Sequence, residues 1–418
     1  MKRYFSEETN FFKGNNPEDL LAEYGSPLYV YSEEIFRQRC REMAHLVDYE
    51  NFKVTYSIKA NSNLTLLKIA REEGLHADAM SPGEIYVLGK AGFTADEIFY
   101  ISNNVSREEM KYAIDKNIMV SVDSLSQLDL FGQLNPGGKV CVRLNTGVGA
   151  GHHEKVITGG KETKFGINSD KIDEIKTILK SHHLILSGLN QHIGSLFMDG
   201  NQYIAGVISL LQVAEMFDDL EFIDFGGGFG ISYSKQDDFQ KRLELEEFGK
   251  ELGAIFKDFS KKYGKDLLYR SEPGRYISAE SSILLGNVYS KKWNGDRVFV
   301  GTDLGFNVLI RPAMYDSHHD VEIYRGGSLL KESPTEIASI VGNICESGDI
   351  MVKNRELPII KEGDIVGVMD AGAYGYSMSS NYNNRLRPAE ILIRLDGKTQ
   401  LIRRRDTLED LVRNFEIE

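Results

Sequence analysis

The segment FKVTYSIKANSNLTLLKIAREEGLHADA (52–79) carries the pattern that decides the fold. It opens with the run FKVTYSIKA (52–60), whose β-branched and aromatic residues favour a strand. The next stretch, NLTLLKIAREEG (63–74), has apolar residues at spacings of three and four, which is typical of an amphipathic helix. A second strand-like run, LHADA (75–79), follows it. A strand, a helix and a strand in succession predict a parallel sheet built from βα units.

The same alternation repeats along the chain as far as residue 271. We count eight strand-like runs, at 52–60, 75–79, 97–102, 118–122, 139–145, 184–191, 221–226 and 266–271. Helix-like segments lie between them, among them SREEMKYAIDKN (106–117), SDKIDEIKTILKS (169–181) and NQYIAGVISLLQVAEMF (201–217). Eight βα units predict a TIM barrel. A doubly wound open sheet is the alternative.

After about residue 280 the pattern changes to short strands without helices between them. The runs are SSILLGNVY (281–289), RVFVGTD (297–303), HDVEIYR (319–325), TEIASIVG (335–342), DIVGVMDAG (364–372) and AEILIRL (389–395). They predict an all-β domain, and TLEDLVRNF (407–415), with a threonine at its start, predicts a short terminal helix. The long glycine-rich connection TGVGAGHHEKVITGGKET (146–163) is typical of a lid, a binding loop or a disordered segment.

Composition narrows the class of protein. A chain of 418 residues exceeds the usual size of one core, which favours two domains. The formal net charge is −13, with 49 basic and 62 acidic residues, which argues against nucleic-acid binding and favours a small-molecule substrate. The three cysteines, Cys40, Cys141 and Cys345, lie far apart and are odd in number, so we expect free thiols in the cytoplasm. The opening MKRYFSEETNFF lacks the apolar core of a signal peptide, and no apolar run is long enough to span a bilayer, so we expect a soluble protein without a membrane partner.

Polar residues close every one of the eight runs, at the barrel end where TIM-barrel active sites form. They are Lys59 and Asn61, then Asp78, Ser81 and Glu84, then Asn103, Asp123, Ser124, Arg143, Asn145, His192, Ser195, Gly226, Gly227, Gly228, Glu272 and Arg275. A desolvated lysine at residue 59 could form a Schiff base with an aldehyde, although most lysines are solvated surface charges. A carboxylate at residue 272 could pair with a cofactor's ring nitrogen, and the arginine at 275 could hold a carboxylate or phosphate. A salt bridge between these last two residues is the alternative.

The glycines in FIDFGGGFGISY (222–233) follow the seventh run, where TIM barrels often hold phosphate groups. Their backbone N–H groups could approach an anion, or the triplet could be only a tight turn. The segment lacks the lysine and serine of a Walker loop. His192 could be a core histidine or a flat ring that stacks on a cofactor. Together, an amine, a phosphate loop, a flat ring and a carboxylate match the needs of pyridoxal phosphate.

Nine motifs in this order resemble the diaminopimelate decarboxylase family, within the alanine-racemase-like class of pyridoxal phosphate enzymes. They are YSIKAN (56–61), DAMSPGE (78–84), KFGI (164–167), HIGS (192–195), DFGGGFG (224–230), EPGR (272–275), RPAMY (311–315), CESGD (345–349) and AGAY with its trailing YN (371–374 and 382–383). The resemblance covers nearly the whole chain, from about residue 25 to 390.

The resemblance implies a TIM barrel with a C-terminal β domain that the N-terminal segment joins. The expected bounds are 31–282 for the barrel and 1–30 with 283–418 for the β domain. It also implies a homodimer with shared active sites, in which the CES motif reaches across from the partner subunit. The implied reaction is the decarboxylation of meso-diaminopimelate to L-lysine and CO₂, the last step of lysine synthesis.

The resemblance also assigns roles to residues. Lys59 would carry the cofactor through a Schiff base, His192 would stack on its ring, and Glu272 would contact the ring nitrogen. The other expected cofactor-binding residues are Asp78, Ser195, Gly226, Gly227, Gly228 and Tyr374. The substrate's distal carboxylate would be bound by Arg275, Arg311 and Tyr315, and its distal amino group by Glu346. Tyr374 would also contact the substrate. Cys345 would reprotonate the α-carbon. No residue is assigned as a metal ligand.

Cys345 stands in a stretch that otherwise reads as β structure, where a cysteine alone would be a small hydrophobic residue. The segments GTDLGFN (301–307) and VGNICES (341–347) depart from the family's commoner wording, which keeps open a D-lysine, D-ornithine or other basic amino acid substrate. A catalytically silent homologue that binds a partner protein is a further alternative. The presence of both Lys59 and Cys345 argues against it.

Overall fold

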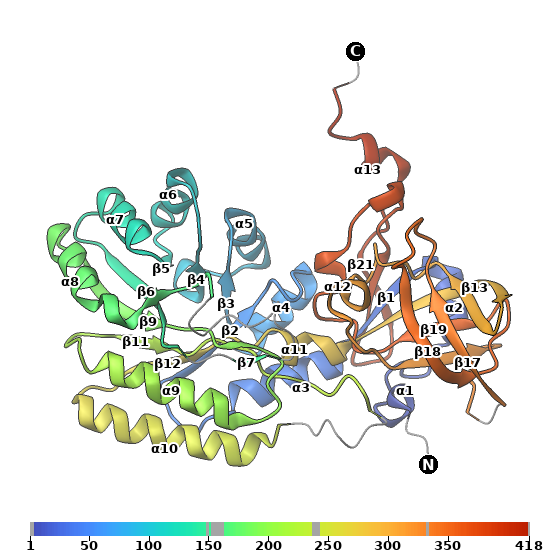
Figure 1. Cartoon of the computed structure of the whole chain (residues 1–418), viewed down its shortest axis with the longest axis horizontal. Helices are drawn as coiled ribbons and strands as arrows, with labels where there is room; N and C mark the ends of the chain where they lie inside the picture. Colours follow the sequence, from blue (N-terminus) through green and yellow to red (C-terminus); the bar gives the residue numbers. More distant parts are fainter. Residues whose placement is uncertain (1–3, 148–149, 152–162, 236–242, 332–333, 417–418) are drawn as a thin grey trace. The chain divides into compact units, whose positions relative to one another are not determined.

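The computed structural model describes residues 4–147, 150–151, 163–235, 243–331 and 334–416 (Figure 1). It consists of two compact units, which we call the barrel unit and the β unit. The barrel unit comprises Arg37–Ile231 and Arg242–Ile277, and the β unit comprises Met1–Phe36, Ser232–Lys241 and Ser278–Glu418. No helix among the described residues is long and apolar enough to cross a membrane.

Eight parallel strands close into a barrel in the first unit. They are β2 (Phe52–Ser57), β3 (His76–Ala79), β4 (Ile98–Ile101), β5 (Met119–Val122), β6 (Lys139–Asn145), β9 (Ile185–Asn190), β11 (Phe222–Asp224) and β12 (Leu268–Ser271). Their order is β5-β4-β3-β2-β12-β11-β9-β6, and the pairing of β5 with β6 completes the ring. Each strand lies within one of the eight runs, so the prediction of a TIM barrel is confirmed and the open sheet is wrong.

Helices surround this barrel (Figure 1). They are α3 (Glu33–Ala44), α4 (Leu64–Glu72), α5 (Pro82–Ala91), α6 (Arg107–Asp115), α7 (Leu125–Leu134), α8 (Ile172–Ser181), α9 (Gly200–Ala214), α10 (Leu245–Tyr263) and α11 (Arg275–Ser278). Several begin with side-chain caps, because Asn63 and Ser106 accept backbone N–H groups at the starts of α4 and α6. The short strands are β7 (Ala150–Gly151), β8 (Ile167–Asn168) and β10 (Gly194–Ser195). Most of the glycine-rich connection 146–163 lies outside the described residues.

The second unit is built almost entirely of strands. These are β1 (Leu28–Ser32), β13 (Ser282–Asn294), β14 (Arg297–Thr302), β15 (Val321–Arg325), β16 (Ser328–Leu329), β17 (Thr335–Val341), β18 (Ile350–Pro358), β19 (Ile365–Val368), β20 (Ala389–Ile393) and β21 (Thr399–Arg403). The short helices are α1 (Phe5–Glu8), α2 (Pro17–Tyr24), α12 (Arg311–Tyr315) and α13 (Leu408–Val412). The predicted terminal helix is confirmed, since the Thr407 side chain caps α13.

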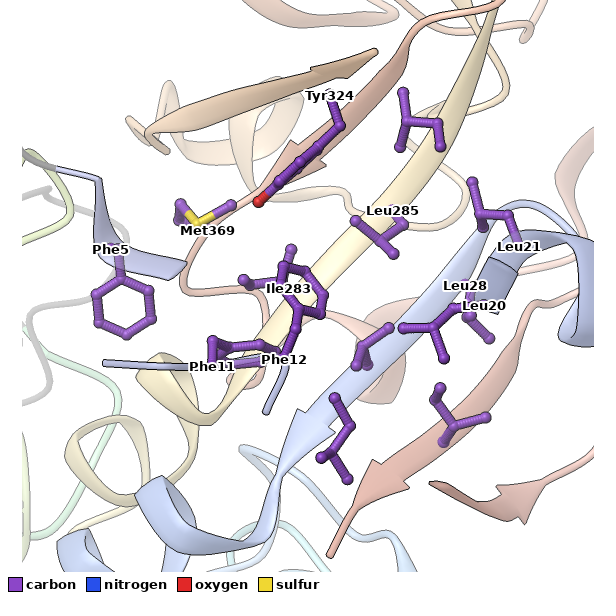
Figure 2. Close-up of a cluster of buried hydrophobic side chains, with 14 of the residues drawn as sticks. Phe5, Phe11, Phe12, Leu20, Leu21, Leu28, Ile283, Leu285, Tyr324 and Met369 are labelled. Carbon is purple, nitrogen blue, oxygen red and sulfur yellow. The ribbon is translucent and has the colours of Figure 1, made fainter. Parts of the chain in front are cut away.

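The N-terminal segment is part of this β unit, as the resemblance implied. Strand β1 lies in the middle of the sheet, antiparallel to β13 and parallel to β20. Side chains from the first residues fill the core beside the sheet, and Figure 2 shows Phe5, Phe11 and Phe12 packed near Ile283 and Met369. Burial of these large apolar side chains is the main force that holds the two distant chain segments together.

The stretch around Cys345 is not a strand. Residues 342–349 form an irregular loop between β17 and β18, and Cys345 is exposed there. The prediction of β structure was wrong because Asp349 takes the backbone N–H groups of Ile344 and Phe306 onto its carboxylate. A strand would give such groups to a neighbouring strand.

Candidate active site

The carboxyl ends of the barrel strands bring four predicted residues into one cluster. Lys59 lies two residues beyond the end of β2, and Asp78 lies within β3. His192 follows β9 and Glu272 follows β12. The charge of Lys59 acts on the pKa of each of the other three groups, which places all four within electrostatic reach of one another. The structure therefore brings these four predicted residues together.

The glycine loop after β11 is held by side chains and backbone on both sides. The Asp224 carboxylate accepts the N–H of Gly226 at 2.8 Å. The N–H of Gly227 donates to His192 Nδ1 at 3.1 Å, and the Glu272 N–H donates to the Gly226 carbonyl at 2.9 Å. A Cβ atom at Gly227 would lie 1.9 Å from the Glu272 carbonyl oxygen, so only glycine fits this close approach.

The two residues on either side of Gly227 also require glycine. Gly226 has φ +72° and Gly228 has φ +105°, a region that favours glycine. A Cβ atom at Gly228 would lie 2.4 Å from the carbonyl oxygen of Gly194. The loop thus packs its bare backbone against the segment that precedes Ser195, and a small anion could approach its N–H groups closely.

Burial raises the pKa of each carboxyl group at this end of the barrel above its ordinary value. It raises the pKa of Asp78 to about 7, against the opposing effect of the Lys59 ammonium group. It raises the pKa of Asp224 to about 6, which the hydrogen bond from Gly226 partly opposes. Burial and the nearby carboxylates of Asp224 and Asp78 hold the pKa of Glu272 well above its ordinary value. A cationic group bound here would favour the ionised form of Glu272.

The His192 ring is neutral, and its hydrogen bond shows which nitrogen carries the proton. Burial holds its pKa well below the ordinary value, and the charges of Lys59 and Arg143 act in the same direction. Because Nδ1 accepts the N–H of Gly227, the proton lies on Nε2. Nδ1 stands 4.0 Å from Glu272 Oε2, but a neutral ring makes this a contact and not an ion pair.

Ser195 and Arg275 also lie together. The Arg275 Nη2 group donates to Ser195 Oγ at 3.0 Å, and Arg275 is buried at the start of α11. The sequence had placed a candidate phosphate ligand at 195 and a candidate carboxylate ligand at 275. Their hydrogen bond brings these two candidate ligands side by side.

The barrel cluster suits an aromatic cofactor with a phosphate group. Glu272 Oε1 is buried and has no hydrogen-bond partner among the described residues, and the same holds for both carboxylate oxygens of Asp78. An orphaned buried acceptor calls for a donor such as a protonated ring nitrogen. The flat neutral ring of His192 and the bare glycine loop supply a stacking surface and N–H donors. The residues present therefore fit pyridoxal phosphate.

The predicted residues of RPAMY lie in the β unit, on α12. Arg311 is buried, its Nη1 group donates to His319 Nε2 at 2.8 Å, and its guanidinium carbon lies 4.3 Å from the centre of the Tyr233 ring. Tyr315 ends the same helix and is partly buried. These contacts fix the plane of the Arg311 guanidinium group within the unit.

The remaining predicted residues also belong to the β unit. Cys345 and Glu346 stand exposed in the loop after β17. The Cys345 N–H donates to Asn383 Oδ1 at 3.0 Å, and the Tyr382 hydroxyl donates to Glu346 Oε1 at 2.6 Å. Tyr374 follows β19 with φ +57°, an uncommon conformation for a tyrosine.

Comparison with known proteins decides the family. A family model described as "Pyridoxal-dependent decarboxylase, pyridoxal binding domain" matches residues 33–279. A diaminopimelate decarboxylase of Methanothermobacter thermautotrophicus is 41% identical over 409 residues, which cover 96% of this chain and 94% of the relative. The chain belongs to the diaminopimelate decarboxylase family. It is therefore a carboxy-lyase whose cofactor is pyridoxal phosphate.

Other members of the diaminopimelate decarboxylase family are also similar to this chain over nearly its whole length. The enzyme of Escherichia coli K12 is 35% identical over 425 residues, with 98% of each chain covered. A crystal structure of diaminopimelate decarboxylase from Helicobacter pylori in complex with L-lysine has a TM-score of 0.86 at 30% identity, over 95% of this chain and 98% of that chain. A lysine/ornithine decarboxylase of Vibrio vulnificus, at 21% identity, has the same fold, with a TM-score of 0.77 over 91% of this chain and 97% of that chain.

Sequence reasoning missed three residues of the diaminopimelate decarboxylase site region. Asp224 holds the glycine loop, and its place two residues before a glycine at a strand end is a recognisable turn signal. Tyr382 and Asn383 hold Glu346 and Cys345, and the sequence showed them only as a motif without a role. No local sequence pattern links either residue to the loop of Cys345, which lies 38 positions before Asn383.

Proposed function

We propose that the chain removes CO₂ from the D-centre of meso-diaminopimelate and releases L-lysine. The observation that carries this proposal is the barrel cluster, in which Lys59, the buried carboxyl group of Glu272, the neutral ring of His192 and the glycine loop all lie at the carboxyl ends of the barrel strands. The near full-length similarity to diaminopimelate decarboxylases supports the same substrate.

The barrel residues would hold the cofactor. Lys59 would bind its aldehyde carbon covalently, as a lysine in a desolvated place can. His192 would stack on the ring, and Glu272 would accept a hydrogen bond from the ring nitrogen. The phosphate group would be bound by Ser195, Gly226, Gly227, Gly228 and Tyr374. Asp78 would keep the charge of Lys59 balanced.

Pyridoxal phosphate, when bound, supplies a protonated ring that accepts the electron pair left at the α-carbon as CO₂ departs. The protein's part is to keep that ring protonated and to return a proton to the α-carbon. Glu272 does the first, because its ionised form would be stabilised by a cation at the ring nitrogen. Cys345 does the second, as a thiol with a dissociable proton on an exposed loop.

Substrate choice would depend on the distal end of the molecule. Arg275, Arg311 and Tyr315 would bind the second carboxylate, Tyr374 would also contact the substrate, and Glu346 would bind the distal amino group. Arginine matches a carboxylate with two parallel hydrogen bonds, so a substrate without that group would lose these bonds. This requirement separates meso-diaminopimelate from D-lysine and D-ornithine.

We include in this proposal a homodimer with shared active sites, in which Cys345 and Glu346 act on the substrate held by the partner's barrel. The exposure of both residues in the β unit supports a role toward another molecule. The domain bounds 31–282 and 1–30 with 283–418 belong to the same proposal.

The reaction is tested by incubating the purified chain with meso-diaminopimelate, with and without added pyridoxal phosphate. Equal amounts of lysine and CO₂ should form, and formation should depend on the cofactor. Lysine without CO₂, or no reaction with the cofactor present, would contradict the proposed function.

A further inference from the structure

The loop of residues 342–349 carries the proposed proton donor at an exposed tip. It joins two antiparallel strands, in which Val341 pairs with Ile350. Exposed loops ordinarily move more than the strands that they join. A proton donor needs a fixed place, because a displacement of about 1 Å can slow catalysis on the order of 10²-fold. The tip with Cys345 and Glu346 therefore needs contacts that hold it.

Asp349 holds the base of the loop. Its buried carboxylate accepts the N–H of Ile344 and the N–H of Phe306, each at 2.7 Å. Its own N–H donates to the Glu346 carbonyl at 3.1 Å, and its carbonyl accepts the N–H of Gly342 at 3.1 Å. A Cβ atom at Gly342 would lie 2.4 Å from the Asp349 carboxylate, so glycine leaves the room that this carboxylate fills. Three of these hydrogen bonds hold the loop together, and the fourth ties it to Phe306.

A second segment, the turn at 382–385, holds the tip. Asn383 Oδ1 accepts the N–H of Cys345 at 3.0 Å, and the Tyr382 hydroxyl donates to Glu346 Oε1 at 2.6 Å. The ring of Tyr382 stacks on Phe306, with centroids 5.7 Å apart and planes at 23°. Because the N–H of Phe306 is bound at the base of the loop, the base and the tip form one connected network.

We propose that Asn383 and Tyr382 are positioning residues of the reaction: Asn383 sets Cys345 for proton transfer, and Tyr382 sets Glu346 for the substrate's distal amino group. Asp349 anchors the loop on which both act. The inference rests on the proposed function, because the roles of Cys345 and Glu346 belong to it. Its consequence is that the two positioning residues control different kinetic constants.

Asn383 is tested with a matched neighbour. Asn383→Gly removes the acceptor but keeps the left-handed backbone, since residue 383 has φ +55°. Asn384→Gly is the control, because residue 384 has φ +54° and its side chain bonds to neither Cys345 nor Glu346 in the described part of the chain. Asn383→Gly should lower kcat by about tenfold or more with KM nearly unchanged, as expected when a donor is displaced. Asn384→Gly should keep the wild-type kcat, and Asn383→Asp, which keeps an oxygen acceptor, should recover most of the lost rate.

Tyr382→Phe tests the proposed role of Tyr382 in positioning Glu346. It removes the hydroxyl and keeps the ring that stacks on Phe306. KM for meso-diaminopimelate should rise by roughly tenfold with little change in kcat, the effect of one lost hydrogen bond to a charged group. A fall in kcat with unchanged KM for this variant would overturn the assignment, as would equal kinetic effects of Asn383→Gly and Asn384→Gly.

Amide hydrogen exchange tests the positioning without substrate. The segment 342–350 should exchange faster in the holoenzyme with Asn383→Gly and with Asp349→Asn than in wild type. Asp364→Asn is the control for the second change, because Asp364 is also buried and accepts the N–H of Lys361. Unchanged exchange in both test variants would overturn the inference. A wild-type enzyme that fails to act on meso-diaminopimelate would contradict the proposed function, while the exchange result would still decide how the loop is held.

Discussion

Three buried carboxyl groups lie at the mouth of the barrel, and the charge of Lys59 acts on two of them, Asp78 and Glu272. Burial raises the pKa of Asp78 to about 7 and of Asp224 to about 6, and it holds the pKa of Glu272 well above its ordinary value. A structural core would avoid such a group of like charges, because each costs free energy to desolvate. Groups with strongly shifted pKa values are typical of functional sites.

The pH dependence of stability follows from these shifts. A carboxyl group whose pKa rises on folding stabilises the protein below its unfolded pKa of about 4, and this contribution disappears as the pH rises through the folded value. For Asp78 that value is about 7. The free energy of unfolding of the cofactor-free protein should therefore fall between about pH 4 and about pH 8. Urea denaturation across this range measures it.

Asp78→Asn should flatten this slope, because the amide does not titrate. Asp115→Asn is the control, since Asp115 is exposed on α6. Equal slopes for wild type and Asp78→Asn would contradict the assignment of the raised pKa to Asp78.

Lys59 should be the single attachment point of the cofactor. Borohydride reduction of the holoenzyme should leave a mass increase on the peptide that contains Lys59, because the reduced Schiff base is a secondary amine that no longer dissociates. Lys59→Ala should show neither the label nor detectable turnover. Lys53→Ala, an exposed lysine on the same stretch of chain, should behave as wild type. A label on another lysine would refute the role of Lys59.

At the scale of elements, the eight barrel strands could be predicted because each has a local apolar pattern. The loop after β17 could not be, since Asp349 and Asn383 decide its conformation through contacts with distant residues. The residues at strand ends, such as Glu272, were found because the barrel fold itself says where to look. Asp224 was missed, although its place two residues before a glycine at a strand end is a recognisable turn signal.

The glycine loop after β11 should tolerate no side chain at residue 227. Gly227→Ala would place Cβ 1.9 Å from the Glu272 carbonyl oxygen and must shift the loop or the end of β12. We expect a lower midpoint of thermal unfolding and weaker cofactor binding, measured by calorimetry and fluorescence titration. Gly89→Ala is the control, because its Cβ meets nothing within 4 Å, and a helical glycine replaced by alanine gains about 1 kcal/mol. Unchanged cofactor affinity in Gly227→Ala would contradict the role of the loop.

At the scale of the whole molecule, the chain separates its proposed functions between two units. The barrel unit carries the cofactor residues, and the β unit carries Cys345, Glu346 and Arg311. The membership of the N-terminal segment in the β unit could be expected only from the family resemblance, because β1 pairs with β13 far along the chain.

Shared active sites predict complementation. Lys59→Ala lacks the cofactor lysine, and Cys345→Ala should bind the cofactor but react slowly, because general acids contribute about 10²–10⁴-fold. If each site takes these residues from two subunits, mixing the two variants should restore activity, with one intact site in each mixed dimer. Assays of the unmixed variants at the same concentration are the control. No recovery at any mixing ratio, with subunit exchange verified, would show that each site is formed by one chain.

The substrate preference tests the central claim most directly. CO₂ release should be measured for meso-diaminopimelate beside D-lysine, D-ornithine, L-lysine and L-ornithine, with pyridoxal phosphate supplied. We predict that kcat/KM for meso-diaminopimelate exceeds that for D-lysine by at least about 10³-fold, since D-lysine lacks the second carboxylate that the arginine residues of the site would bind. A kcat/KM for D-lysine within about tenfold of that for meso-diaminopimelate would contradict the claim. So small a difference is less than the loss of one hydrogen bond to a charged group would cause.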